Sequence, residues 1–258
     1  MKFFKKKNGF NHQEPIIDAI RIGNKIRDWL HESINYEFIS IGENCNSSWY
    51  LKEMNLKQNS YPFDWIFSSP SITLDAITNK FNDFLNREYI VSKGGFAGHS
   101  VYHESLFNHR NPLSSQKDYD YYVRCCERFL DILEKNNPIL FICTVIMEPE
   151  KRPKWSNGFV GNYKLKENRD NEFDLLQKKI TKLNNNAKFL FIKQYTEGYP
   201  SINLDKSNIN ATWISITSKG SNNGVKFLEA ADETIIKALF CSISNAQLEK
   251  CKLEQLVS

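Results

Sequence analysis

The sequence has no long hydrophobic run. No segment approaches the about eighteen apolar residues that a membrane-spanning helix requires. The basic start, MKFFKKKNGF, is not followed by the apolar stretch of a secretory signal. We therefore expect no membrane span and a cytoplasmic location.

Paired-cysteine patterns and the common cofactor motifs are also missing. The six cysteines form no CxxC pair, and a chain of 258 residues can build its core without disulfides or structural metal, so we expect reduced thiols. GxxxxGK[ST], GxGxxG after a strand, HExxH and GxSxG do not occur. These absences argue against standard nucleotide-binding, zinc-protease and α/β-hydrolase sites, and we predict no cofactor and no metal.

The charge balance is nearly even. The net charge is +4, and Lys2, Lys5, Lys6 and Lys7 supply part of the excess at the N-terminus. Such a small excess gives no reason to expect a nucleic-acid partner. Hydrophobic residues at 41% and charged residues at 25% are typical of a globular protein.

The pattern along the chain favours an α/β domain. We expect a tail with a packing helix in residues 1–36 and a single domain in 37–258. Within that domain, three apolar runs alternate with helical patterns, which favours a mostly parallel sheet with helices on both faces, a three-layer arrangement. The strands are predicted near 37–41, 139–146, 189–195 and 212–216, and the helices near 16–30, 45–54, 72–85, 118–135, 172–183 and 225–240. The loops at 149–169 and 196–210 are long enough to be lids.

The turn Gly42-Glu43-Asn44-Cys45 is the strongest local feature. It falls between a predicted strand and a predicted helix, where ligands bind in parallel α/β sheets. A thiol at a helix N-terminus is expected to have a pKa below its usual value of about 8.5, which would make Cys45 a nucleophile. The helix amides or the Asn44 side chain could stabilise an oxyanion. The alternative is that Cys45 is a small buried core residue.

Three histidines share the parity of one predicted strand-like stretch. His99, His103 and His109 would be about 13 and 20 Å apart if that stretch stayed extended, too far for one metal ion. One of them could be the base for Cys45, and His103 and His109 both remain candidates. The alternative for each is a hydrogen-bonded structural histidine.

The segment SYPFDWIFSSP contains a carboxylate among aromatic residues. Asp64 could orient a histidine, or it could cap its own turn. The aromatic residues, Trp65 among them, are expected to fill the core or to line a pocket wall. They are not accompanied by the interleaved basic residues of a nucleic-acid-binding surface.

Several segments together resemble one known family. FISIGENC, SYPFDWIFSSP, Phe107-Asn108-His109 and YYVRCCERFLDIL are similar to the family labelled putative papain-like cysteine peptidases, a group of unknown function from bacteria and large viruses. The resemblance covers about residues 37–195. It implies Cys45 as the nucleophile, His109 as the base and Asp64 as a polar residue of the same site. It also implies, as the alternative fold, a papain-like α+β arrangement.

These observations lead to three hypotheses. The first is a cysteine-nucleophile hydrolase or acyltransferase that acts on a peptide, amide or other small acyl substrate. Its catalytic residues would be Cys45, His109 and Asp64, and its substrate-binding residues Glu43, Asn44, Trp65 and His103. The second is a transferase that uses a nucleotide-sugar or polysaccharide-related substrate. The third is a non-catalytic binding module, in which the same segments only brace the fold.

Overall fold

A five-stranded sheet forms the centre of the protein. The computed structural model describes residues 13–31, 34–151, 156–166 and 170–244. The strand order is β1-β5-β6-β8-β7, and every neighbouring pair is parallel except β8 and β7. The strands are β1 (Glu37–Ser40), β5 (Ile139–Ile146), β6 (Ala187–Tyr195), β7 (Ser201–Ser207) and β8 (Ala211–Thr217).

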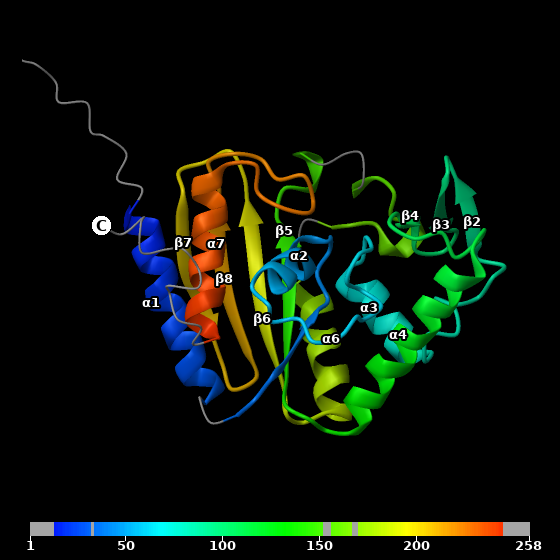
Figure 1. Ribbon diagram of the computed structural model, residues 1–258, viewed down its shortest axis with the longest axis horizontal. Coiled ribbons are helices and arrows are strands. Elements are labelled where there is room, and N and C mark those ends of the chain that lie inside the picture. The colour runs from blue at the N-terminus through cyan, green and yellow to red at the C-terminus, as the bar shows by residue number, and fades with distance from the viewer. Residues whose placement is uncertain (1–12, 32–33, 152–155, 167–169, 245–258) are drawn as a thin grey trace, which may run out of the picture.

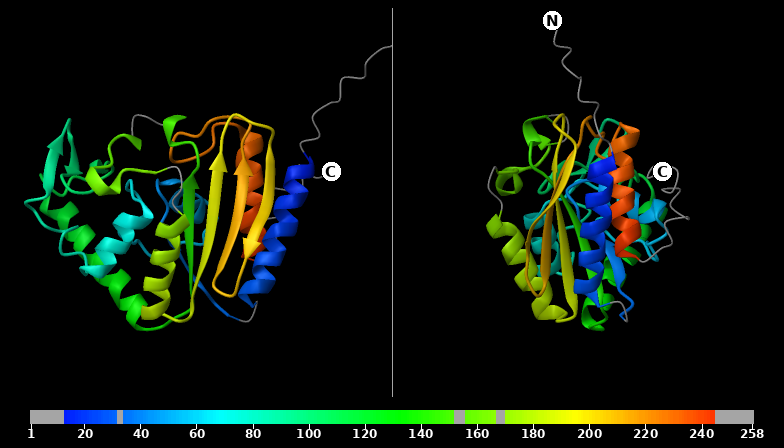
Figure 2. Two further views of the ribbon diagram at one scale, coloured as in Figure 1. Left: turned by 180° about the vertical axis from the view of Figure 1, so that it is seen from behind. Right: turned by 90° about the vertical axis from the view of Figure 1, so that its left-hand side faces the viewer.

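Helices cover both faces of this sheet (Figures 1 and 2). One face packs on α1 (Gln13–Leu30), α2 (Asn46–Glu53) and α7 (Ala230–Ile243), and the other on α3 (Pro70–Thr78), α4 (Gln116–Glu134) and α6 (Asp170–Leu183). All eight residues of β5 are buried, because successive side chains of a central strand point to opposite covered faces. The predicted three-layer α/β fold is confirmed. The papain-like alternative is wrong for this sheet, because β1, β5, β6 and β8 are parallel.

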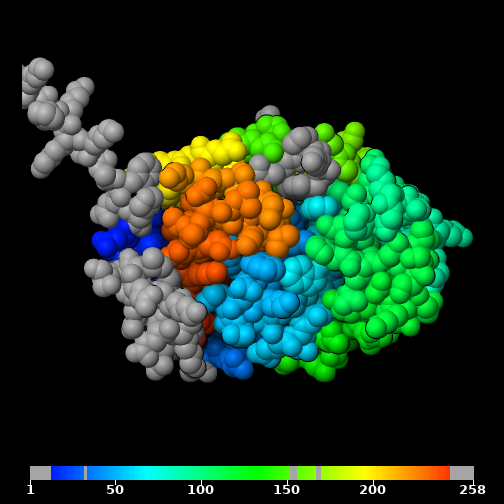
Figure 3. Space-filling model, turned by 45° about the horizontal axis from the view of Figure 1, so that its top comes forward, coloured from blue at the N-terminus to red at the C-terminus, as the bar shows by residue number. Residues whose placement is uncertain are grey.

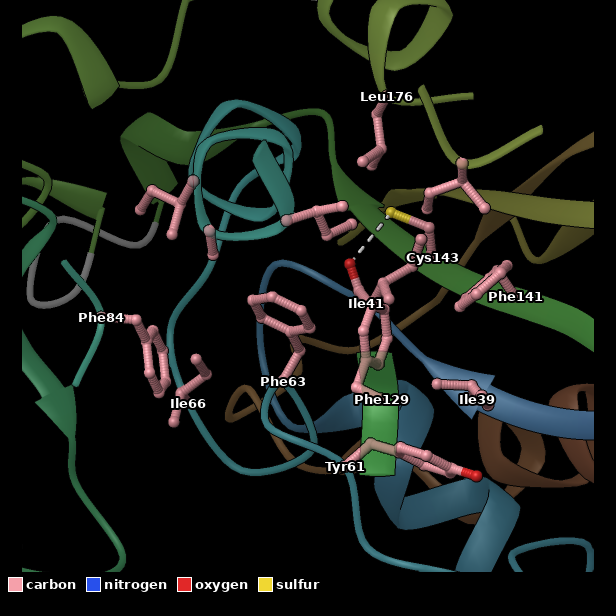
Figure 4. Close-up of a cluster of buried hydrophobic side chains, with 14 of the residues drawn as sticks. Ile39, Ile41, Tyr61, Phe63, Ile66, Phe84, Phe129, Phe141, Cys143 and Leu176 are labelled. Atoms are coloured by element: carbon pink, nitrogen blue, oxygen red, sulfur yellow. Dashed lines mark hydrogen bonds between the residues drawn. The ribbon is translucent and has the colours of Figure 1, made fainter. Parts of the chain in front are cut away.

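The core on the α3, α4 and α6 side is rich in aromatic rings (Figure 4). Phe63 and Phe129 are fully buried and meet edge to face at 5.6 Å between ring centroids. Beside them, the Cys143 thiol donates to the carbonyl oxygen of Ile41 at 3.4 Å. This cluster joins the segment that follows β1 to the central strand β5.

A small antiparallel sheet lies at the far end of the molecule from α1 (Figure 1). It consists of β2 (Ile90–Lys93), β3 (Phe96–His99) and β4 (His103–Phe107). His99 and His103 face each other across the β3–β4 turn, so the stretch that we predicted as one strand is folded back on itself. The chain then leaves β4 towards residue 109.

Two other predictions need correction. The helix expected over 72–85 ends at Thr78, and the left-handed φ angles of Lys80 (54°) and Phe81 (62°) are incompatible with its continuation. The lid expected at 196–210 contains β7, an edge strand with six of its seven residues at least partly exposed. Its sequence therefore lacks the apolar run of the central strands. No helix among the described residues is long and apolar enough to cross a membrane.

Gly98 allows β3 and β4 to approach closely. A Cβ atom at this position would overlap the carbonyl oxygen of Glu104, a backbone atom that cannot rotate away. We expect Gly98→Ala to lower the free energy of unfolding by about 1–3 kcal/mol, measured by urea denaturation. The exposed Ser92→Ala on the neighbouring strand β2 is the control and should change it by less than about 0.5 kcal/mol. Equal stability of the two variants would contradict the prediction.

Candidate active site

Cys45 lies in the turn between β1 and α2 and is the N-cap residue of that helix. The turn is tight because Gly42 has no side chain. A Cβ there would be 2.5 Å from Ser47 Oγ and 3.1 Å from the Thr144 amide nitrogen. Ser47 and Thr144 hydroxyls are hydrogen-bonded at 2.7 Å, which fixes the start of α2 to the end of β5. Cys45 therefore occupies the carboxyl edge of the parallel strands, where the sequence predicted a site.

His109 follows β4 and lies beside this cysteine. Its Nε2 atom is 3.4 Å from Cys45 Sγ, although the two residues are 64 positions apart. The His109 side chain is exposed, whereas Cys45 is only 2% exposed. Trp65 packs edge-on against the imidazole, with the ring centroids 5.8 Å apart. The structure thus brings Cys45, His109 and Trp65 together.

The backbone beyond His109 is anchored to α4. Arg110 Nη1 is 3.1 Å from Asp118 Oδ1, and its guanidinium lies 3.9 Å from the centre of the Tyr121 ring. The Asn111 amide donates to the other Asp118 oxygen at 3.1 Å. These contacts hold the imidazole-bearing segment against the first turn of α4.

His103 and His99 belong to the core. His103 is 1% exposed, its Nδ1 accepts from the Ser105 amide at 2.9 Å, and its ring packs on Phe67 and Phe159. His99 is fully buried and stacks on Tyr102 at 4.4 Å. The described residues contain no group of three or more His, Cys, Asp or Glu side chains that could hold a metal ion. Of these three histidines, His109 is the one in contact with Cys45.

A known protein family matches the part of the chain that contains Cys45 and His109. Residues 36–154 match the model of a family of unknown function described as "putative papain-like cysteine peptidase". This confirms the family resemblance over residues 36–154, and the match does not extend to residue 195 as predicted. The matched segment includes Cys45, Asp64 and His109. No curated protein and no solved structure shows a significant match to the chain.

The Cys45 thiol has a raised pKa. Burial raises it to about 12, the nearby Asp64 carboxylate adds to the rise, and Lys57 opposes it. Partial desolvation of the imidazole, on the side that faces Cys45, also lowers the pKa of His109 below 6.5. At neutral pH the pair is therefore a thiol beside an uncharged imidazole. The expected lowering of the thiol pKa is wrong, because desolvation of the sulfur outweighs its place at a helix N-terminus.

Asp64 is bound to neighbours other than the imidazole. The carboxylate is 1% exposed, and its Oδ2 lies 2.5 Å from Lys57 Nζ and accepts from the Tyr61 amide at 2.6 Å. Lys57 Nζ also donates to Ser48 Oγ at 2.9 Å. Asp64 thus caps its own turn and pairs with a lysine that the sequence analysis did not single out. Among the described residues 34–151, no hydrogen bond joins Asp64 to His109.

Glu43 and Asn44 are buried in the turn before Cys45. Glu43 extends the β1–β5 pairing, since its amide donates to Thr144 O at 3.0 Å and its Oε2 accepts from the Ile146 amide at 2.8 Å. Asn44 Oδ1 accepts from the Asn46 amide at 3.0 Å. Asn44 Nδ2 is buried and has no acceptor among the described residues. Glu43 therefore holds the turn against β5. Asn44 Nδ2 is a donor without an acceptor among the described residues, and it belongs to the residue before Cys45.

A chain of amides fixes the residue after Cys45. Gln194 Nε2 donates to Asn46 Oδ1 at 2.8 Å, and Asn222 Nδ2 donates to Gln194 Oε1 at 2.8 Å. All three side chains are buried. They join α2 to the end of β6 and to the segment after β8. No pattern in the sequence indicated this network, because its members are far apart along the chain.

The cysteines differ in state. Cys45, Cys125, Cys126 and Cys143 are buried free thiols. Cys241, in α7, is disulfide-bonded, so the expectation of reduced thiols throughout is wrong for that residue.

Proposed function

We propose that the protein is a cysteine-nucleophile hydrolase of peptide, amide or thioester bonds, with Cys45 as the nucleophile and His109 as the base. The observation that carries the proposal is the 3.4 Å separation between Cys45 Sγ and His109 Nε2. A nucleophile and a base within hydrogen-bond reach are the signature of covalent catalysis. The papain-like family match over residues 36–154 supports the same chemistry.

The protonation states determine the first step. Because the thiol and the imidazole are both uncharged at neutral pH, His109 Nε2 takes the thiol proton as Sγ attacks the substrate carbonyl carbon. The imidazolium then gives this proton to the leaving nitrogen or sulfur, and an acyl-cysteine remains. His109 next takes a proton from water as the water oxygen attacks the acyl carbon, the carbon–sulfur bond breaks to release the acid, and the imidazolium returns its proton to the Cys45 sulfur. Cys45 is 2% exposed, so substrate entry requires side chains over the sulfur to move aside.

Two kinds of donor are available for the negative oxygen of the tetrahedral intermediate. The first-turn amides of α2 follow Cys45 directly, and of these the Asn46 amide already donates to Asn44 Oδ1. Asn44 Nδ2 is a buried donor without an acceptor among the described residues. A donor that is desolvated before the reaction needs little reorganisation when the oxyanion forms. We assign Asp64 a positioning role, since it fixes the turn that carries Trp65 against the imidazole.

Alkylation tests whether His109 activates Cys45. Iodoacetamide at pH 7, followed by peptide mass spectrometry, should modify Cys45 faster than Cys125, Cys126 or Cys143, which lie in buried positions away from an imidazole contact. His109→Ala should slow alkylation of Cys45 by about 100-fold and leave the other three rates unchanged. Labelling of Cys45 at the same rate in both proteins would refute the proposed pair.

A further inference from the structure

Two adjoining surface depressions lie next to the proposed site. One, of about 440 Å³, is lined by residues of α2, of the segment 57–60 and by Trp65. The other, of about 230 Å³, is lined by the same segment and by the exposed side of α4. They share Gln58, Asn59 and Ser60 in their linings, so they adjoin each other, and we call the two depressions together the groove. In Figure 3 the segment 46–65, blue to cyan, borders the green surface that includes α4.

The groove is basic. Lys52 and Lys57 line one half, Arg124 and Arg128 line the other, and no carboxylate is among the described residues that line either half. Lys57 is paired with Asp64, and Arg128 donates to the Ser60 carbonyl at 2.6 Å. These two cations are therefore held in place.

The other two cations are exposed. Lys52 and Arg124 form no ion pair within the part of the chain that the structure describes. Glu37 Oε1 accepts from Asn59 Nδ2 at 3.0 Å and from the Tyr61 hydroxyl at 2.7 Å, and it forms no ion pair with Lys52 or Arg124 among the described residues. Two cations without partners at opposite halves of one groove create a positive potential along it.

The groove reaches Trp65, whose ring packs on His109. Lys57 Nζ lies 5.3 Å from the centre of the Trp65 ring, and this ring is 5.8 Å from that of His109. His109 in turn contacts Cys45 Sγ at 3.4 Å. A molecule bound in the groove would therefore lie beside Trp65, one ring away from the imidazole.

We propose that this groove binds an acidic polypeptide segment, so that the substrate of the hydrolase carries Asp or Glu residues next to the bond that is cleaved. This inference rests on the proposed function. Carboxylates match the two unpaired cations, Lys52 and Arg124, and the amide side chains of Gln58 and Asn59 can pair with a peptide backbone. A polypeptide supplies the acyl bond that the Cys45–His109 chemistry needs, whereas a nucleic acid does not.

Peptide binding to an inactive variant tests the groove separately from the chemistry. The full chain with Cys45→Ser would be titrated into a fluorescein-labelled glutamate-rich octapeptide and into the same peptide with glutamine in place of glutamate. Fluorescence anisotropy at 50 and 300 mM NaCl should show about tenfold tighter binding of the acidic peptide at low salt and a loss of that preference at high salt. Circular dichroism would verify that the variant is folded.

A double variant locates the binding. Lys52→Gln with Arg124→Gln should weaken binding of the acidic peptide by about tenfold, whereas Lys52→Arg should keep it. The matched control, Lys178→Gln with Lys182→Gln on α6, removes two lysines from another surface and should have no effect. Equal affinity for both peptides, unchanged binding by the groove variant, or tighter binding of a single-stranded RNA of equal charge would each overturn the inference. Binding by the inactive variant without cleavage by the wild type would instead count against the proposed hydrolysis alone.

Discussion

His109→Ala should lower kcat for hydrolysis of an acyl substrate by about 10²- to 10⁴-fold, and Cys45→Ala should abolish it. The reason is the 3.4 Å contact, which gives the sulfur its proton acceptor, and the pKa of about 12, which leaves the thiol unreactive without one. Release of a fluorogenic amine from acidic peptide amides measures the rate. Cys126→Ala, which removes a buried thiol of the α4 core, is the matched control and should retain kcat.

The pH profile of kcat/KM should follow the imidazole. Burial lowers the pKa of His109, so the base form persists below pH 6.5, and activity should fall only as the pH drops through that lowered value. The thiol, with a pKa of about 12, should add no titration between pH 7 and pH 10. A bell-shaped profile whose alkaline limb begins near pH 8 would indicate a thiolate–imidazolium pair and contradict this mechanism.

Asp64→Ala should lower the free energy of unfolding by about 3–5 kcal/mol, because it leaves the Lys57 ammonium buried without its partner. The Lys57 and Asp64 side chains are only 11% and 2% exposed. The substitution also removes the acceptor of the Tyr61 amide. Urea denaturation with a fitted m-value measures the effect.

A double variant and a control variant test whether the unpaired Lys57 charge causes the loss of stability. Lys57→Met added to Asp64→Ala should recover part of the lost stability, since no unpaired charge then remains in the interior. Lys135→Ala breaks an exposed pair with Asp131 on α4 and should cost less than about 1 kcal/mol. If Asp64→Ala were as mild as Lys135→Ala, the buried pair would not stabilise the turn.

Much of the fold could be predicted because it depends on continuous apolar patterns. The bounds predicted for β5 agree with the structure, and β6 and β8 were found to within a few residues, since strands buried on both faces have few polar residues. The edge strand β7 was missed because most of its side chains are exposed. The β3–β4 turn was missed because its alternating residues resemble one longer strand.

The site was predictable only in part. The place of Cys45 followed from a strand, a glycine turn and a helix, which are all local, and His109 was assigned through the family resemblance. The Lys57–Asp64 pair and the Gln194 link to Asn46 depend on residues that meet only after folding. The direction of the Cys45 pKa shift was also inaccessible, because it depends on how deeply the sulfur is buried.

The reactive pair joins two separately built parts of the molecule. Cys45 follows β1, the outermost strand of the large sheet on that side, whereas His109 arrives from the small antiparallel sheet inserted between β1 and β5. A shift of the inserted part by about 1 Å relative to the large sheet would separate the sulfur from its proton acceptor and could change the rate by about 10²-fold. Substitutions at the contact between the two parts, far from the sulfur, can therefore change kcat while Cys45 and its turn stay unchanged.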